Sequence, residues 1–260
     1  MLHGMAEPIQ WQDDRSAIVE IIPGVGGREA QLWADDVREM LVKYAKRLAF
    51  TVEEFGHLHG GSYMAIRGRG AYAVFKYEAG IHEVQRVPTT DQHGRIHSSA
   101  ASVIVLPEIK ESEFAIRGSD LKMETFKGEE GLNSGVSITH IPSGLQVSVQ
   151  SSQDEAENIH NAMHLLRARL YRLDQSKRKR GWSLMRKEQR ATGQRAERIR
   201  TYNYKEGRVR DHRTGVKTMQ LRQVLDGRLE LFTIAMRNKE EAKAQSKKGL
   251  SALRQQSSKS

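Results

Sequence analysis

Cysteine is absent from this chain of 260 residues, which excludes disulfides, thiolate zinc sites and a cysteine nucleophile. Apolar runs are also short. None approaches the roughly 18 residues that a bilayer span requires, so we do not expect a membrane partner. Residues 1–7 lack the basic and then apolar regions of a signal peptide. We expect a soluble protein of the cytoplasm or of an organelle matrix, with one large domain or two modest ones.

The positive charge is concentrated in one stretch. The chain has a formal net charge of +10, and residues 176–213 alone hold 14 Lys and Arg against 4 Asp and Glu. The positive charges of such a block repel one another unless water or anions surround them. Nucleic-acid phosphates are the common anionic partner. The block lacks the aromatic and leucine face of a membrane-surface helix, so we favour RNA. A solvated helix and loop without a special role is the alternative.

Hydrophobic periodicity outlines the first half of the chain. Residues 17–22 are apolar and β-branched and precede a Pro-Gly turn, which predicts a strand. A helix is expected over 28–47, because apolar residues recur on one face and Glu29 lies in the first turn, where the helix dipole favours a carboxylate. That face consists of Trp33, Val37, Met40, Leu41 and Tyr44. The clearest strands after it are expected at 72–76 and 101–106.

The second half predicts a smaller β-unit and further helix. Residues 136–141 and 145–149 flank Pro-Ser-Gly, which indicates a hairpin. A helix is expected from 153 to about 175, with Ile159, Met163, Leu166, Leu170 and Leu173 as its apolar stripe. The tail from Lys239 is polar and is expected to fray. These elements predict the α+β class, with two β-containing units.

Three motifs admit a chemical interpretation, and each also has a plain structural one. The glycines at 24–27 let a base or phosphate approach backbone N–H groups at a helix N-terminus, or they make a tight turn. His57, His59, His93 and His97 lack the companions of a zinc site, so we expect no metal and no cofactor. Residues 85–99 gather hydroxyls, amides, imidazoles and guanidiniums. This inventory suits an unpaired base or an ordinary polar loop.

Five segments together resemble bacterial-type class I peptide chain release factors. They read Gly-Val-Gly-Gly-Arg-Glu-Ala at 24–30, His-Glu-Val-Gln-Arg-Val-Pro-Thr-Thr at 82–90, Gly-Arg-Ile-His-Ser-Ser at 94–99, Arg-Thr-Tyr-Asn-Tyr at 200–204 and Gly-Arg-Val-Arg-Asp-His-Arg at 207–213. Their order and spacing match from about residue 13 to residue 231. The subtype resembled reads UAA and UAG, because its Pro-x-Thr signature stands here as Pro88-Thr89-Thr90.

The resemblance implies both an architecture and a site. A codon-recognition superdomain is expected from residues 8–116 together with 198–260. A small α+β domain of βββα type, similar to the peptidyl-tRNA hydrolase domain of the family, is expected at 117–180 and is followed by a basic linker at 181–197. Gly26 and Glu29 would hold the first uridine of the stop codon, Thr90 the first two bases, His97 the second, and Gln85 with Ser98 the third. The residues assigned to RNA-backbone contact are Lys177, Arg178, Lys179, Arg180, Arg200, Arg208 and Arg210.

The chain departs from the family at several points. Ser98 stands where threonine is usual, and Glu83 where arginine is usual. The family's N-terminal helical domain is expected to be missing. The segment 127–134 is shorter than the family's catalytic loop and lacks Gly-Gly-Gln, whose backbone amide stabilises the reacting oxyanion in the family. Its Glu129 and Glu130 bring negative charge to a site walled by RNA.

From these observations we expect a protein that is not an enzyme. It would bind the ribosomal A site, the mRNA stop codon and ribosomal RNA in termination, its regulation or rescue, without hydrolysing peptidyl-tRNA and with a possible helper protein. Two alternatives stay open. One is an RNA-binding factor for a transcript or for ribosome assembly that does not decode. The other is an active release factor with an altered loop.

Overall fold

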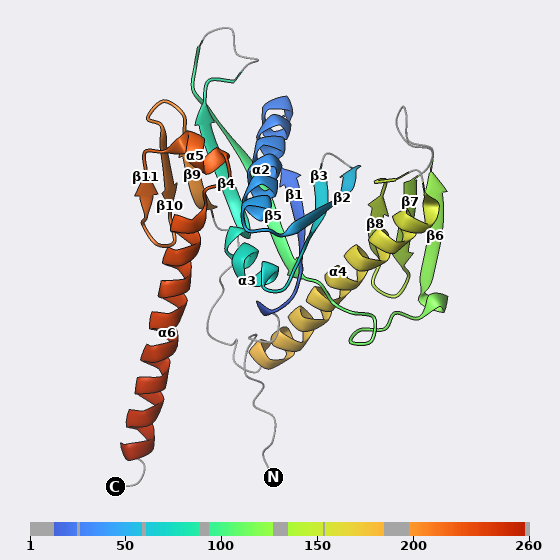
Figure 1. The fold of residues 1–260 in the computed structure, drawn as a ribbon. Helices are drawn as coiled ribbons and strands as arrows, with labels where there is room; N and C mark the ends of the chain where they lie inside the picture. Colours follow the sequence, from blue (N-terminus) through green and yellow to red (C-terminus); the bar gives the residue numbers. More distant parts are fainter. Residues whose placement is uncertain are drawn as a thin grey trace.

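The computed structural model describes residues 13–24, 27–58, 61–88, 94–126, 135–152, 154–184 and 198–257. Its centre is an eight-stranded sheet in the order β11-β10-β9-β4-β5-β1-β3-β2 (Figure 1). The strands pair antiparallel except β4 with β9, which are parallel. The bounds are β1 Ala17–Pro23, β2 Thr51–Leu58, β3 Gly61–Arg67, β4 Gly80–Arg86, β5 His97–Pro107, β9 Arg198–Asn203, β10 Arg208–Asp211 and β11 Lys217–Thr218.

One face of this sheet is covered by the helix α2, Gly27–Arg47. The predicted apolar face is confirmed, since Trp33, Val37, Met40, Leu41 and Tyr44 are all buried. They pack against Ala17, Val19 and Ile21, the alternate residues of β1 that point to the same side of the sheet. The indole of Trp33 also donates from Nε1 to the carbonyl of His82 at 2.9 Å, which fixes the helix over β4.

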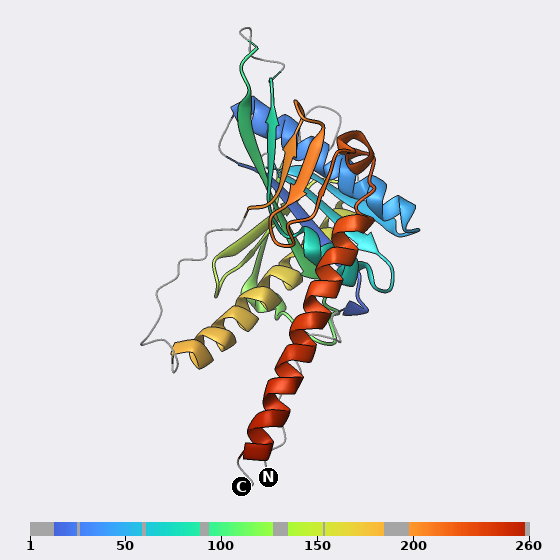
Figure 2. The same cartoon turned by 90° about the vertical axis from the view of Figure 1, so that its left-hand side faces the viewer.

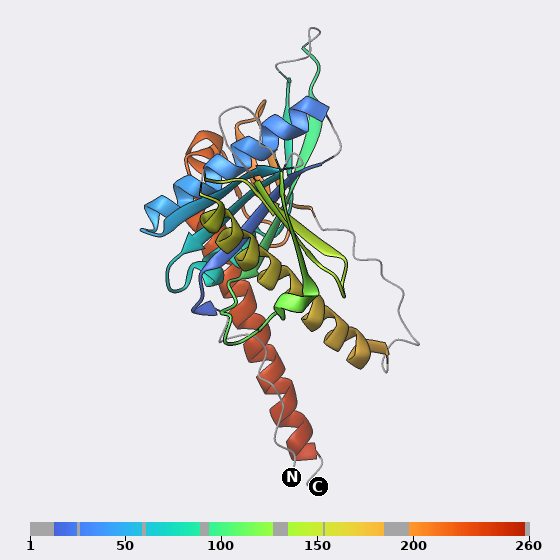
Figure 3. The same ribbon diagram turned by 90° about the vertical axis from the view of Figure 1, so that its right-hand side faces the viewer.

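The opposite face is covered by a smaller unit. Its three-stranded sheet has the order β6-β7-β8, from Leu121–Phe126, Gly135–His140 and Leu145–Val149. The hairpin predicted around Pro142 is confirmed as β7 and β8. Figure 3 shows the helix α4, Glu155–Leu184, lying along this sheet. Leu165, Leu166 and Leu170 of α4 share one buried cluster with Ile18 and Leu106 of the large sheet.

Two expectations about local structure were wrong. Residues 72–76 are not a strand. They lie in the short helix α3, Ala71–Phe75, and the 3-10 turn η1, Lys76–Glu78. Ala71 and Phe75, four residues apart, both enter the core below α2, and this spacing suits a helical turn. The helix α4 does not end near residue 175 but continues to Leu184. It therefore includes positions 177–180, the first four Lys and Arg of the basic block.

The chain also remains helical where we expected fraying. After the short helix α5, Leu221–Leu225, the helix α6 runs from Glu230 to Ser257. Figures 1 and 2 show α6 projecting from the body of the protein. Residues 239–245 of this helix are all Lys, Glu, Ala or Gln, and these residues have high helix propensity. No helix among the described residues has the length and apolar character to cross a membrane.

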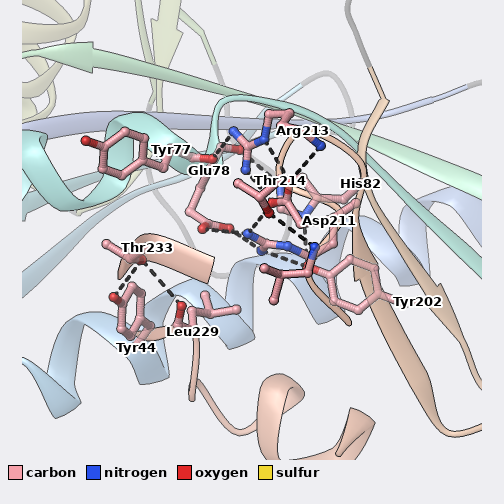
Figure 4. Close-up of polar contacts among 12 residues, drawn as sticks. Tyr44, Tyr77, Glu78, His82, Tyr202, Asp211, Arg213, Thr214, Leu229 and Thr233 are labelled. Atoms are coloured by element: carbon pink, nitrogen blue, oxygen red, sulfur yellow. Dashed lines mark hydrogen bonds and ion pairs between the residues drawn. The ribbon is translucent and has the colours of Figure 1, made fainter. Parts of the chain in front are cut away.

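A buried ionic cluster joins the late strands to the early part of the chain. Arg200 of β9 is 0% exposed and donates to both carboxylate oxygens of Glu78, at 2.7 and 3.1 Å. Asp211 of β10 accepts from Arg200 at 3.3 Å and from Arg213 at 2.6 Å (Figure 4). Each buried charge therefore has an opposite charge beside it, as burial in a low-dielectric interior requires.

Candidate nucleic-acid interface

The polar segment 85–99 contains the facing ends of two strands. β4 ends at Arg86 and β5 begins at His97, so the predicted loop is shorter than its polar composition indicated. The facing ends of β4 and β5 project past the N-terminal end of α2 (Figure 2). Arg86 pairs with His97, and Gln85 pairs with Ser98. Gly26 and Thr90, two of the predicted site residues, lie outside the described residues.

Strand alternation separates the predicted site into two faces. Gln85 and Ser98 are cross-strand neighbours and point to one side of the sheet, while Arg86 and His97 point to the side of α2. His97 and Ser98 are both exposed, and Pro88 is buried at the end of the hairpin. The structure thus brings Gln85 and Ser98 together and places His97 on the other face.

The amide of Gln85 is oriented by two neighbours. Its Nε2 donates to Glu83 Oε1 at 3.2 Å, and Asn203 Nδ2 donates to its Oε1 at 3.2 Å. Glu83 is itself held by Arg198 at 2.6 Å, so the carboxylate that departs from the family pattern has a cationic partner in β9. A side chain restrained in this way presents its remaining hydrogen-bonding positions in one orientation, which base recognition needs.

Glu29 is bound by an arginine that we did not select from the sequence. Its Oε1 accepts from Arg86 Nε at 2.6 Å, and Arg86 Nη1 also donates to Asp36 Oδ2 at 2.5 Å and to the Tyr204 hydroxyl at 3.3 Å. Burial alone would lower the pKa of Arg86, but these partners outweigh it and raise that pKa. Arg86 therefore joins the start of α2, the end of β4 and the β9–β10 turn. Its place inside the Gln-Arg-Val-Pro motif was the available signal.

The predicted RNA-backbone residues fall into three groups. Arg210 is exposed on β10, and Arg208 is half-buried and pairs with Glu206 at 2.9 Å. Residues 177–180 continue α4, but their side chains lie outside the described set. Arg200 corrects the expectation, because its 0% exposure and its contacts with Glu78 and Asp211 leave no surface for a phosphate.

The described residues contain no group of three or more side chains placed to hold a metal ion. Of the four histidines considered above, only His97 has a described side chain, and its cross-strand neighbour is Arg86. The described side chains at this site offer hydrogen bonding, stacking and charge, which are the means of nucleic-acid recognition.

Two family models match the chain, a PCRF domain over residues 2–103 and an RF-1 domain over residues 110–213. Peptide chain release factor 1 of Thermotoga maritima is 45% identical over 228 residues, or 82% of this chain and 66% of the relative. Peptide chain release factor 1 of Clostridium botulinum is 40% identical over 255 residues, or 93% of this chain and 71% of the relative. The chain spans about two thirds of the length of such relatives.

The fold has a match among solved structures. Release factor 2 of Thermus thermophilus superposes with a TM-score of 0.79 at 30% identity, covering 86% of this chain and 67% of that one. This similarity confirms the predicted α+β architecture.

The relatives also correct one expectation. We expected a protein that is not an enzyme, because residues 127–134 lack Gly-Gly-Gln. Relatives at 40–45% identity are peptide chain release factors, whose reaction is the hydrolysis of peptidyl-tRNA, so the expectation conflicts with them and is not kept. One short segment carried that inference, and it lies outside the described residues.

Proposed function

Because the chain belongs to the class I peptide chain release factors, we propose that it binds the ribosomal A site and reads the stop codons UAA and UAG in translation termination. Its partners are the mRNA stop codon and ribosomal RNA, in the cytoplasm or an organelle matrix. The observation that carries this proposal is the pairing of Gln85 with Ser98 on one face of the hairpin, while His97 lies on the other face, opposite Arg86.

Each base of the codon then has its own chemical partner. The hydroxyl of Ser98 and the amide of Gln85 both donate and accept, so they accommodate adenine or guanine at the third position. The imidazole of His97 stacks on the second base. Thr90 in the Pro-x-Thr signature contacts the first two bases, and Gly26 and Glu29 hold the first uridine.

The domain boundaries support the same assignment. We propose that residues 8–116 and 198–260 form one codon-recognition superdomain, since β9 completes the sheet beside β4. The unit at 117–180, with its three strands and α4, is inserted between them and leads into the linker 181–197. Arg208, Arg210 and the basic residues 177–180 contact the RNA backbone.

For the chemical step, we propose the segment 127–134, which joins β6 to β7. It contains Gly128 and Gly131 but no Gly-Gly-Gln. A backbone N–H that faces the developing oxyanion can stabilise it whatever the side chain, provided that it is placed in advance. Release on UAA complexes tests this role: the intact chain should free the peptide, and a deletion of residues 129–132 should not. Equal release by both would assign the segment no role.

Codon reading is tested by binding to ribosome complexes with UAA, UAG, UGA or a sense codon in the A site. We expect tight binding to UAA and UAG only. Ser98→Ala and Gln85→Ala should weaken binding roughly tenfold, because each loses a hydrogen bond to the third base. The control is Ser102→Ala, farther along β5 on the same face. Equal binding to all four codons would overturn the decoding proposal and favour an RNA-binding factor that does not decode.

A further inference from the structure

A cavity of about 810 Å³ opens on the α2 side of the codon hairpin. Its lining residues come from α2, the end of β4, the start of β5 and the β9–β10 turn. Gln85 and Ser98 point to the other side of the hairpin, so this space is separate from the third-base face. A volume of this size is typical of a small-molecule site.

The walls of the cavity are apolar and open to water. Val87 is 45% exposed, Ile96 50% and the ring of Tyr204 36%. The three residues line the same cavity together with Leu32. The guanidinium of Arg86 lies 5.3 Å from the centre of the Tyr204 ring and supports it from the protein side. Solvent-exposed apolar side chains around the ring of Tyr204 form a slot that a planar ligand ring can fill.

The floor of the cavity is negative. Arg86 bonds both Glu29 and Asp36, so two carboxylates share one guanidinium. Glu29 is 7% exposed and does not line the cavity, whereas Asp36 does. Asp36 is 39% exposed at its side chain and contacts Arg86 through Oδ2. The floor thus attracts N–H donors and repels phosphate.

The rim has the opposite charge. Lys205, in the turn between β9 and β10, lines the mouth of the cavity and is exposed. Its ammonium can meet a phosphate outside while the ring of the same nucleotide enters the slot. An apolar slot, an acceptor floor and a cationic rim together match a nucleotide with its base inserted.

We propose that this cavity holds one unpaired nucleobase with an exocyclic amino group, from outside the stop codon. The base stacks on Tyr204, its N–H groups donate to Asp36, and its phosphate faces Lys205. Guanine fits best, because its N1–H and N2–H2 are adjacent donors. Uracil presents one N–H between two carbonyl oxygens, which the carboxylate of Asp36 repels. The proposal rests on the proposed function only for the source of the base, which is the mRNA or ribosomal RNA.

The first test uses the free full-length protein. Binding of GMP and UMP is measured by ligand-observed NMR on the wild type and three variants. We expect GMP to bind more tightly than UMP. Tyr204→Ala should weaken GMP binding roughly tenfold, whereas Tyr204→Phe should not, because the ring alone stacks. Asp36→Asn should reduce the preference for GMP over UMP.

The matched controls are Ile141→Ala, an apolar residue exposed on the small unit, and Lys217→Gln, an exposed lysine on β11. Both should bind GMP as the wild type does. Equal binding of GMP and UMP, or unchanged GMP binding by Tyr204→Ala, would overturn the proposal. Tyr204→Ala leaves the pairs of Arg86 with Glu29 and Asp36 in place. Weaker GMP binding by this variant therefore reports the loss of the ring and not the loss of these ion pairs.

The second test identifies the source of the base. Ribosome complexes carry UAA followed by G, A, C or U. If the mRNA supplies the base, wild-type affinity depends on that nucleotide and Tyr204→Ala removes the dependence. If ribosomal RNA supplies it, Tyr204→Ala weakens all four complexes equally. Unchanged affinity of Tyr204→Ala on every complex would overturn the site. A wild type that binds GMP but ignores the stop codon would refute the proposed function and leave the cavity assignment standing.

Discussion

Arg200 and Glu78 form an ion pair without solvent contact, and both side chains are 0% exposed. Two hydrogen bonds join them, and the ring of Phe232 in α6 lies 4.3 Å from the guanidinium. Burial alone would raise the pKa of Glu78, but the charge and hydrogen bonds of Arg200 hold it below its usual value. Arg200 lies in β9, Glu78 in the turn η1 before β4, and Phe232 in α6. The ion pair therefore links β9 and α6 to η1.

Replacing Arg200 by methionine should destabilise the protein by on the order of 3–5 kcal/mol, because Glu78 would lose its closest cation inside the core. Urea unfolding measures the change. The control is Arg198→Met, two residues earlier, whose pair with Glu83 is half exposed at the arginine and should contribute less than about 1 kcal/mol. Similar small losses for both variants would contradict the structural role.

The neutral imidazole of His82 should make stability depend on pH. Its Nε2 lies 2.9 Å from the carbonyl of Glu78, so that nitrogen carries the hydrogen, and Nδ1 accepts from the Tyr202 hydroxyl at 3.0 Å. Burial lowers the pKa of His82 from 6.5 to about 4. Between these values the unfolded chain binds a proton that the folded protein does not.

Stability should therefore decrease as pH falls from about 6.5 to about 4, by up to roughly 1.4 kcal/mol per pH unit from this group. Urea unfolding across that range measures the slope, and His82→Gln should reduce it. Tyr202→Phe should destabilise at pH 7 by about 1–3 kcal/mol, because Nδ1 loses its donor. A slope that is the same in wild type and His82→Gln would contradict this assignment.

Gly56 of β2 lies close to the backbone of the small unit. Its φ is +92°, and a Cβ there would lie 2.2 Å from the carbonyl oxygen of Gln150. Gly56→Ala should destabilise more than Gly144→Ala, whose φ is +66° and whose Cβ would meet open space. Both variants carry a left-handed backbone cost of roughly 1–2 kcal/mol, so the excess in thermal unfolding reports the clash. Equal losses would show that β2 and the small unit can separate at little cost.

A second link between these parts is ionic. Arg169 of α4 donates to both carboxylate oxygens of Glu20 at 2.8 Å, and Glu20 is 2% exposed in β1. Arg169→Leu should cost about 3–5 kcal/mol by leaving a buried carboxylate unpaired. The double variant with Glu20→Leu should recover much of that loss in urea unfolding. Arg172→Leu, exposed on the same helix, is the control. A double variant as unstable as the sum of the single ones would rule out coupling.

The sequence predicts elements well where one physical pattern dominates. The apolar stripe of α2 and the Pro-Ser-Gly turn before β8 each allow one arrangement, and both are confirmed. Residues 72–76 were misassigned because Tyr72, Val74 and Phe75 favour strands locally. Their helical turn follows from the burial of Ala71 and Phe75 under α2, a tertiary contact that no local pattern contains.

Charge was the least informative pattern. Arg200 and Arg210 stand in the same basic block, yet one is buried and the other exposed. The difference depends on Glu78, which lies 122 residues earlier in the chain and meets Arg200 only after β9 pairs with β4. Arg86 was missed for the same reason, since Glu29 and Asp36 become its partners only through folding.

The parallel pairing of β9 with β4 has a consequence for biosynthesis. Until residue 203 has been made, β4 pairs only with β5 and its other edge is open, and the carboxylate of Glu78 lacks its partner Arg200. An unfinished chain that stops in the linker would present this edge to other strands, and open edges promote aggregation. Closure across more than a hundred residues is slow, so the nascent protein depends on synthesis proceeding without a long pause between β5 and β9.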